Sequence, residues 1–109
     1  MKLITKDIEK RLEKYPLYSQ DGKGDDAIIV CKFFLGGFTW YVLEAEKLPD
    51  GKYNFYGIVR NDGIQCCEYG YFSLEELEKI KAFGFLTVER DMYFEPKRVG
   101  DCTEATMYL

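Results

Sequence analysis

Three consecutive charged residues, Glu89-Arg90-Asp91, lie in a stretch whose residues favour an extended conformation. On an extended chain the side chains of Glu89 and Asp91 share one face, and that of Arg90 lies on the other. Two carboxylates on one face can hold Mg²⁺ or act as an acid and a base. We favour a structural ion pair to a helix or a neighbouring strand, because a cation site normally needs more oxygen ligands than these two residues provide.

Lys32 interrupts an apolar stretch at residues 28–35. Its side chain can reach water at the sheet edge, pair with Glu44, Glu68 or Asp91, or meet an anionic ligand. Two roles are also open to the tyrosines at positions 53, 56, 69 and 71. They belong to the aromatic core and its rim, or they line a pocket for a planar ligand. The candidate ligand- or partner-binding residues are Lys32, Trp40, Tyr56, Tyr69, Glu89, Arg90 and Asp91.

No histidine occurs in the chain, so it lacks the commonest general base and the commonest metal ligand. A Ser-His-Asp or Cys-His arrangement is therefore impossible within one chain. The four cysteines, at positions 31, 66, 67 and 102, lack the paired Cys-x-x-Cys spacing of zinc sites. Gly22-Lys23-Gly24 is too short for a phosphate-binding loop. We predict no catalytic residue, no cofactor and no bound metal.

Composition indicates one folded domain, because the 109 residues are 47% hydrophobic and 17% aromatic. We expect a single domain at 1–109, with a folded core at 1–96 and a tail at 97–109. The net charge of −4 argues against direct nucleic-acid binding. There is no signal-peptide run and no apolar stretch of about 20 residues. We therefore expect a cytoplasmic protein with reduced thiols and no membrane contact.

Two helices are expected. An apolar stripe at intervals of three and four residues predicts the first at residues 5–15, with Thr5 as its N-cap. Ser73 and Glu76 form the pattern of a capping box and predict the second at 73–82. Gly84 is expected to cap the C-terminus of this second helix.

Between the helices, polar residues at 19–26 predict a mobile loop, and four strands follow it, separated by glycine-containing turns. The strands are expected at residues 28–35, 38–46, 53–60 and 64–72. A fifth strand is expected at 85–90. The predicted fold is α+β: a four- to five-stranded, mainly antiparallel meander sheet with an N-terminal helix and a helix after strand four.

The first two strands are predicted to form a hairpin that is apolar on both faces. If Gly36-Gly37 is a two-residue loop, Leu35 pairs with Phe38 and Phe33 with Trp40. One face then holds Ile29, Cys31, Phe33, Leu35, Phe38, Trp40 and Val42, and the other holds Ile28, Val30, Phe34, Tyr41, Leu43 and Ala45. In a sheet with one solvated face, apolar and polar residues alternate along each strand instead. Either helices cover both faces, or one face meets another molecule.

The chain resembles a bacterial family of small proteins, domain-of-unknown-function family 2958. The motifs that carry the resemblance include Lys2-Leu3-Ile4-Thr5-Lys6, Gly70-Tyr71-Phe72-Ser73-Leu74-Glu75-Glu76-Leu77 and Glu89-Arg90-Asp91-Met92-Tyr93-Phe94-Glu95-Pro96. The resemblance implies a cytoplasmic protein of plasmids and other mobile elements, with no assigned activity and an accessory role. Cys66-Cys67 and the residues after Pro96 depart from the family pattern.

The sequence favours a non-catalytic protein that recognises another protein or a second copy of itself. One alternative is a small-molecule or nucleotide binding module, with weak metal-dependent hydrolysis as a variant, using Glu89, Asp91, Lys32 and Trp40. Another is an acidic imitation of DNA that blocks a nuclease. The net charge of −4 gives this last reading little support, because lysines and arginines are spread among the acids.

Overall fold

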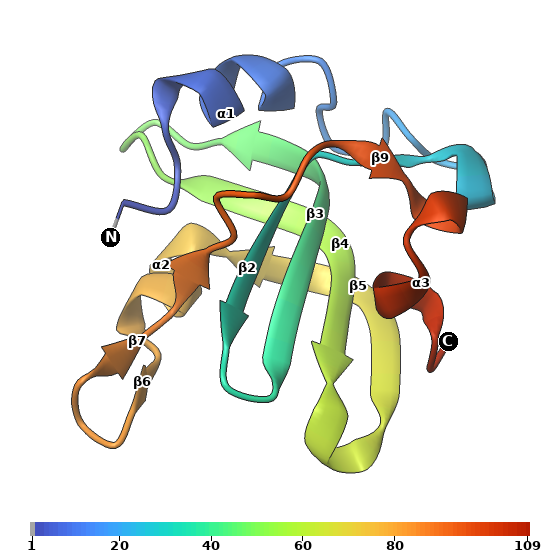
Figure 1. Cartoon of the computed structure of the whole chain (residues 1–109). Coiled ribbons are helices and arrows are strands. Elements are labelled where there is room, and N and C mark those ends of the chain that lie inside the picture. Colours follow the sequence, from blue (N-terminus) through green and yellow to red (C-terminus); the bar gives the residue numbers. More distant parts are fainter. Residues whose placement is uncertain (1) are drawn as a thin grey trace.

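The computed structural model describes residues 2–109 and is built on a five-stranded antiparallel sheet in the order β5-β4-β3-β2-β8 (Figure 1). Its strands are β2 (Cys31–Leu35), β3 (Phe38–Lys47), β4 (Tyr53–Asn61), β5 (Cys66–Ser73) and β8 (Glu89–Arg90). The helices are α1 (Lys6–Leu12), α2 (Leu74–Lys79) and α3 (Thr103–Thr106). This confirms the predicted α+β meander, with one helix before the sheet and another directly after β5.

Shorter elements complete the chain. Two antiparallel pairs lie outside the main sheet: β1 (Ile28–Ile29) with β9 (Lys97–Arg98), and β6 (Lys81–Ala82) with β7 (Leu86–Thr87). Three short 3₁₀ turns are η1 (Gly24–Asp26), η2 (Asp62–Ile64) and η3 (Val99–Asp101). No helix among residues 2–109 has the length and apolarity needed to cross a membrane.

The β2–β3 hairpin has the predicted register. Leu35 pairs with Phe38 and Phe33 with Trp40, and Gly36 takes the positive φ (+56°) that the tight turn requires. Consecutive side chains along a strand point to opposite faces, so the sheet has a Trp40 face and a Tyr41 face. Both faces are apolar in their central part, as expected.

Two irregularities move residues to the face opposite the predicted one. A break at Val30 separates β1 from β2, so that Ile29 packs with Tyr41 instead of with Phe33. A β-bulge between Val42 and Glu44 has the same effect on Ala45, which packs on the Trp40 face. Because side chains along a strand alternate with a period of two, one unpaired residue is enough to move the residues beyond it to the opposite face of the sheet.

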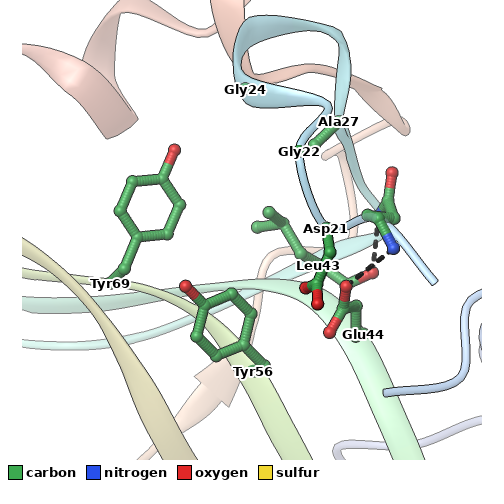
Figure 2. Close-up of a pocket in the computed structure, with 9 residues that line it drawn as sticks. Asp21, Gly22, Gly24, Ala27, Leu43, Glu44, Tyr56 and Tyr69 are labelled. Atoms are coloured by element: carbon green, nitrogen blue, oxygen red, sulfur yellow. Dashed lines mark hydrogen bonds between the residues drawn. The ribbon is translucent and has the colours of Figure 1, made fainter. Parts of the chain in front are cut away.

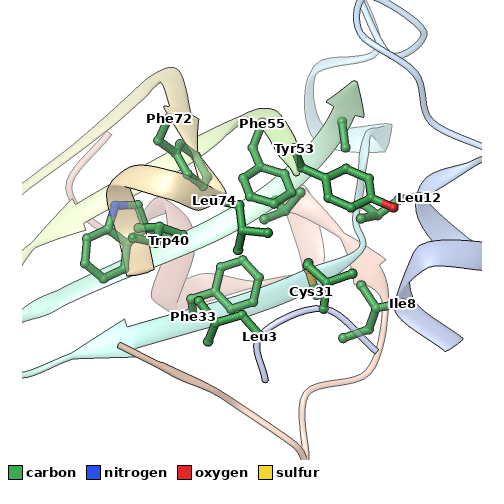
Figure 3. Packing of buried hydrophobic residues seen from close by; sticks show 14 of the residues in the cluster. Leu3, Ile8, Leu12, Cys31, Phe33, Trp40, Tyr53, Phe55, Phe72 and Leu74 are labelled. Atoms are coloured by element: carbon green, nitrogen blue, oxygen red, sulfur yellow. The ribbon is translucent and has the colours of Figure 1, made fainter. Parts of the chain in front are cut away.

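Separate segments cover the two faces. On the Trp40 face, Ile8 and Leu12 of α1 and Leu74 and Leu77 of α2 pack over the sheet (Figure 3). On the Tyr41 face the cover comes from residues 97–109, which we call the C-terminal segment, together with Ala27. The central part of the hairpin is therefore shielded on both sides by the chain itself.

The C-terminal segment differs from the expected loose tail. Its strand β9 pairs with β1, and its apolar residues Val99, Cys102 and Ala105 are buried against the Tyr41 face. They recur at intervals of three, so a 3₁₀ turn followed by a helical turn places all three on one side. The folded part of the chain thus continues past residue 96.

Both helices begin where predicted and end earlier. Thr5 Oγ1 accepts a hydrogen bond from the Ile8 amide at 3.3 Å, and Ser73 Oγ accepts one from the Glu76 amide at 3.1 Å. Helix α1 ends at Leu12 and α2 at Lys79. Gly84 is not the cap of α2: it lies in the β6–β7 turn, where it and Phe83 both have positive φ (+78° and +54°).

Candidate functional site

A pocket of about 230 Å³ opens on the Tyr41 face, beyond the part that the C-terminal segment covers (Figure 2). We call it the tyrosine pocket. Its lining residues are Gln20, Asp21, Gly22, Gly24, Ala27, Leu43, Glu44, Tyr56 and Tyr69. Two sequence candidates, Tyr56 and Tyr69, thus meet in one cavity, while the opposite wall is the loop before β1.

The aromatic wall is set by the pairing of β4 with β5. Tyr56 lies opposite Tyr71, and Ile58 lies opposite Tyr69, so the three tyrosines project from one face of neighbouring strands. The rings of Tyr56 and Tyr69 stack with centroids 6.1 Å apart and planes at 16°. The ring of Tyr71 meets that of Tyr56 at 5.0 Å and 55°. The result is a row of aromatic rings, of which Tyr69 and Tyr71 are exposed.

The opposite wall is held by buried polar side chains. The Glu44 carboxylate accepts hydrogen bonds from the backbone amides of Tyr18 and Gln20, both at 2.8 Å. The Gln20 side chain in turn donates to the carbonyls of Ile28 and Leu43 at 2.8 Å each, and accepts from the Ile28 amide at 2.6 Å. Each polar atom of this buried pair has partners, which is the condition for burial without a large cost.

These bonds correct the expected mobile loop at 19–26, since its first part is anchored to β1 and β3. Sequence reasoning missed Gln20 and Glu44, because a glutamine in a polar stretch gives no sign of burial. The signal that could have found Glu44 is its place in an otherwise apolar run, 40–45, of a central strand. A buried carboxylate there needs donors from a neighbouring segment.

Electrostatics in the tyrosine pocket follow from burial and from nearby acids. Burial is the main cause that raises the pKa of Tyr56, and the carboxylates of Glu44 and Asp21 raise it further. Burial also raises the pKa of Tyr69, to which Asp25 contributes. The pKa of Tyr71 is raised chiefly by a hydrogen bond with Tyr18. The tyrosines stay as neutral phenols in a region of negative potential.

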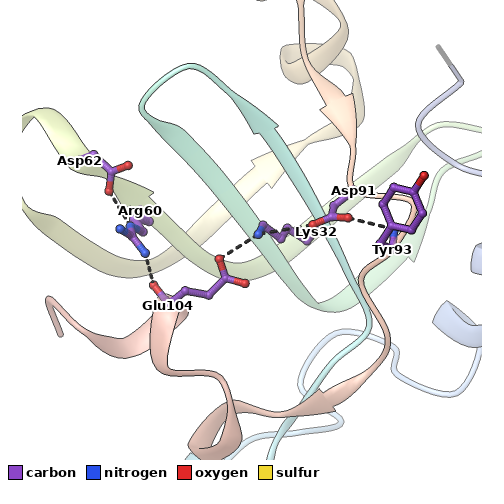
Figure 4. A network of polar contacts seen from close by, with 6 residues as sticks. All are labelled: Lys32, Arg60, Asp62, Asp91, Tyr93 and Glu104. Carbon is purple, nitrogen blue, oxygen red and sulfur yellow. Dashed lines mark hydrogen bonds and ion pairs between the residues drawn. The ribbon is translucent and has the colours of Figure 1, made fainter.

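Lys32 belongs to a second polar cluster on the same face, between the sheet and α3 (Figure 4). Its ammonium group lies 2.8 Å from Glu104 Oε2 and 3.5 Å from Asp91 Oδ2. Arg60 donates to the Glu104 carbonyl at 2.7 Å and pairs with Asp62 at 2.6 Å. The cluster ties the C-terminal segment to β2 and β4.

The three charged candidates at 89–91 have different neighbours. Arg90 donates to the backbone carbonyls of Lys2 and Leu3, so it braces β8 against the N-terminal residues. Asp91 pairs with Lys32, one of the partners considered above, while Glu89 is exposed. Among residues 2–109 no group of three or more His, Cys, Asp or Glu side chains is placed to hold a metal ion.

Trp40 lies apart from these charges. It is buried in the core on the Trp40 face, where its ring stacks on that of Phe38 at 5.9 Å and 18°. Lys32 is next to Phe33, the pairing partner of Trp40, and therefore points to the opposite face. The structure does not bring Trp40 and Lys32 together.

Exposed apolar side chains gather on the β6–β7 hairpin, which sequence reasoning did not single out. Phe83 and Phe85 are 86% and 75% exposed, and Leu86 is 43% exposed. The hairpin sits at the margin of the molecule (Figure 1), and a hollow of about 360 Å³ separates Phe85 and Leu86 from Phe34 and Leu35 of β2. The signal in the sequence was the apolar run Phe83-Gly84-Phe85-Leu86, because neither a helix nor a strand with this spacing would bury all of its side chains.

The chain belongs to the family described as protein of unknown function, DUF2958, whose model matches residues 3–101. This confirms the resemblance seen in the sequence motifs. The match ends just before Cys102, so α3 and Glu104 lie beyond it. Comparisons with curated proteins and with solved structures found no match.

Proposed function

We propose that this member of the DUF2958 family is a non-catalytic interaction protein that binds another protein through its β6–β7 hairpin. The observation that carries the proposal is the exposure of Phe83 and Phe85 on a hairpin of only two residues per strand. Exposed aromatic groups of this kind are costly in water and are typical of interaction sites.

The backbone supports this use of the hairpin. Phe83 has a φ of +54°, an unusual conformation for a residue with a bulky side chain, in the turn that presents it to solvent. The hollow beside Phe85 has apolar walls from both β2 and β7. A partner that fills the hollow would remove Phe34, Leu35 and Leu86 from water together with the two phenylalanines, which favours association through apolar burial.

The proposed biological setting is an accessory role in a bacterial mobile element, as the family resemblance implies. The other functions considered have less geometric support. The residues considered for nucleotide binding or hydrolysis are distributed between a buried core, an ion pair and an exposed edge. Imitation of DNA needs rows of unpaired carboxylates, whereas several acids here pair with lysine or arginine, as in Asp91 with Lys32 and Asp62 with Arg60.

The test is affinity capture from the native host with three forms of the chain: wild type, a Phe83→Ser/Phe85→Ser variant and an Ile64→Ser control. Ile64 is 71% exposed in η2, outside the hairpin, so its replacement tests for unspecific apolar binding. We expect one protein to be retained by the wild type and the control and lost with the hairpin variant. That protein, once purified, should bind the wild type directly.

Light scattering after size-exclusion chromatography identifies the other outcome, self-association. A wild-type dimer that the hairpin variant converts to a monomer would assign the hairpin to a homodimer contact. A monomeric wild type whose captured proteins are the same as those of the hairpin variant would contradict the proposal. Circular dichroism of each form checks that the fold is retained.

A further inference from the structure

We propose that the tyrosine pocket binds the guanidinium group of an arginine side chain carried by a partner protein. The pocket shares no lining residue with the β6–β7 hairpin or its hollow, so the inference does not depend on where the hairpin binds. It adds to the proposed function a chemical requirement on the partner, which must present an arginine side chain to the pocket.

The shape of the pocket suits a flat cation. Tyr56 and Tyr69 present stacked rings along one wall, and Gly22 and Gly24 add no side-chain bulk to their part of the opposite wall (Figure 2). A guanidinium group stacks on aromatic faces and is attracted by their negative electrostatic potential. The volume of about 230 Å³ suits one side chain, since pockets for larger ligands begin at about 300 Å³.

The charge of the pocket has the sign that a cation requires. Asp21 and Glu44 line it, and none of its lining residues is a lysine or an arginine. The Asp21 side chain is exposed and forms no ion pair with any of residues 2–109, so its charge is available to a ligand. Glu44 already accepts two backbone hydrogen bonds, yet its oxygens have further acceptor positions. Burial is the main cause of the raised pKa of Tyr56 and of Tyr69, and nearby carboxylates, Glu44 and Asp21 for Tyr56 and Asp25 for Tyr69, raise it further.

The neighbouring strand indicates a protein as the source of the arginine. Tyr69 lies on β5, which is the outermost strand at its edge of the sheet. Within residues 2–109 the outer side of β5 pairs with no further strand, so an extended segment of a partner can add to this edge. Side chains of such a segment alternate between the two faces, and those on the Tyr41 face lie beside the pocket.

The direct test is an NMR titration of the ¹⁵N-labelled chain with N-acetyl-arginine amide. Its matched control ligand is the citrulline analogue, which has nearly the same shape and no charge. We expect amide shifts that cluster at Gly22, Gly24, Ala27 and Tyr69, with a Kd of about 1 mM as for one weakly held side chain. The citrulline analogue should bind at least about fivefold more weakly, because it lacks the cation–π and ionic attraction.

Two variants probe the two parts of the pocket, with Tyr93→Leu as the control because Tyr93 is 90% exposed and does not line the pocket. Tyr69→Leu and Asp21→Asn should each weaken arginine amide binding at least about threefold. The spectrum of each variant shows whether it is folded. The Phe83→Ser/Phe85→Ser variant should bind arginine amide like the wild type, so failure of the hairpin proposal would leave this one standing.

Three results would overturn the inference. One is the absence of pocket shifts at about 10 mM arginine amide, ten times the expected Kd. Another is equal affinity for the citrulline analogue, which would show that the pocket recognises shape without charge. The last is unchanged affinity in both Asp21→Asn and Tyr69→Leu, because the binding would then lie elsewhere.

Discussion

Lys32 Nζ and Glu104 Oε2 meet at 2.8 Å although the two residues are 72 positions apart in the chain (Figure 4). The contact joins β2 in the middle of the fold to α3 near its end. Arg60 strengthens the junction by donating to the Glu104 carbonyl. The C-terminal segment is thus held to the Tyr41 face by charge as well as by apolar burial.

We expect the Lys32–Glu104 pair to contribute measurable coupling to stability. The Lys32 side chain is only 15% exposed, so water screens the pair less than it screens a surface ion pair. A double-mutant cycle with Lys32→Met and Glu104→Gln, measured by urea unfolding, should give a coupling free energy of about 1 kcal/mol. The exposed Lys79–Glu75 pair is the matched control and should give about 0.3–0.5 kcal/mol. Equal coupling in the two cycles would show that the cluster contributes no more than a surface pair.

Gly57 is expected to be intolerant of any side chain. It lies on β4 opposite Val42, beside the bulge that precedes Glu44. A Cβ atom there would lie 1.8 Å from the Tyr41 carbonyl oxygen, so the backbone of β3 would have to move. Gly57→Ala should lower the free energy of unfolding by about 1–3 kcal/mol or more. Gly70→Ala is the control, because a Cβ there meets nothing within 4 Å, and it should change stability by about 0.5 kcal/mol at most. Similar losses at both positions would contradict the close approach.

Local signals account for the elements that sequence analysis located correctly. Adjacent glycines set the β2–β3 register, and hydroxyl side chains at Thr5 and Ser73 set the helix starts. Each of these signals acts within a few residues, so the surrounding fold was not needed to interpret it. Tyr56 and Tyr69 differ from these elements, because the pairing of β4 with β5 brings them together, and the sequence left a tyrosine-lined pocket as one of two alternatives.

Features that depend on contacts between distant segments could not be predicted in this way. The break at Val30 and the bulge before Glu44 depend on how β3 pairs with its neighbours and on the loop that docks there. The C-terminal segment is ordered by the Tyr41 face, and the spacing of Val99, Cys102 and Ala105 does not tell which surface those residues pack against. Gln20 likewise becomes a buried structural residue only because Glu44 and Leu43 lie beside it.

The four cysteines are expected to differ in reactivity. Cys31, Cys67 and Cys102 are buried, and Cys66 is partly exposed. Burial raises the pKa of Cys31 to about 12 and also raises that of Cys66, where Glu68 contributes. Because the thiolate is the reactive form, a thiol reagent at pH 8 should modify about one equivalent of the native chain, slowly, at Cys66. In urea all four should react. Cys66→Ser should abolish the native reaction, and rapid modification of a second thiol would contradict the packing of the C-terminal segment or of the core.

The stability of the chain is expected to fall in alkaline solution, in part through Tyr53. Burial raises the pKa of Tyr53 to about 12, and a hydrogen bond to Glu9 adds to the effect. The unfolded chain therefore loses this proton near pH 10 while the folded chain keeps it, so the stabilisation is complete below pH 10 and is lost as the pH rises towards 12.

The variant Tyr53→Phe tests this pH dependence, because it lacks the hydroxyl group that titrates. By urea unfolding, the wild type should be more stable than Tyr53→Phe by about 1 kcal/mol between pH 7 and 9, because of the hydrogen bond. That difference should then shrink by about 1.4 kcal/mol for each pH unit above 10. A difference that stays constant up to pH 11 would show that the Tyr53 hydroxyl titrates alike in the folded and unfolded chain, which its burial beside Glu9 does not allow.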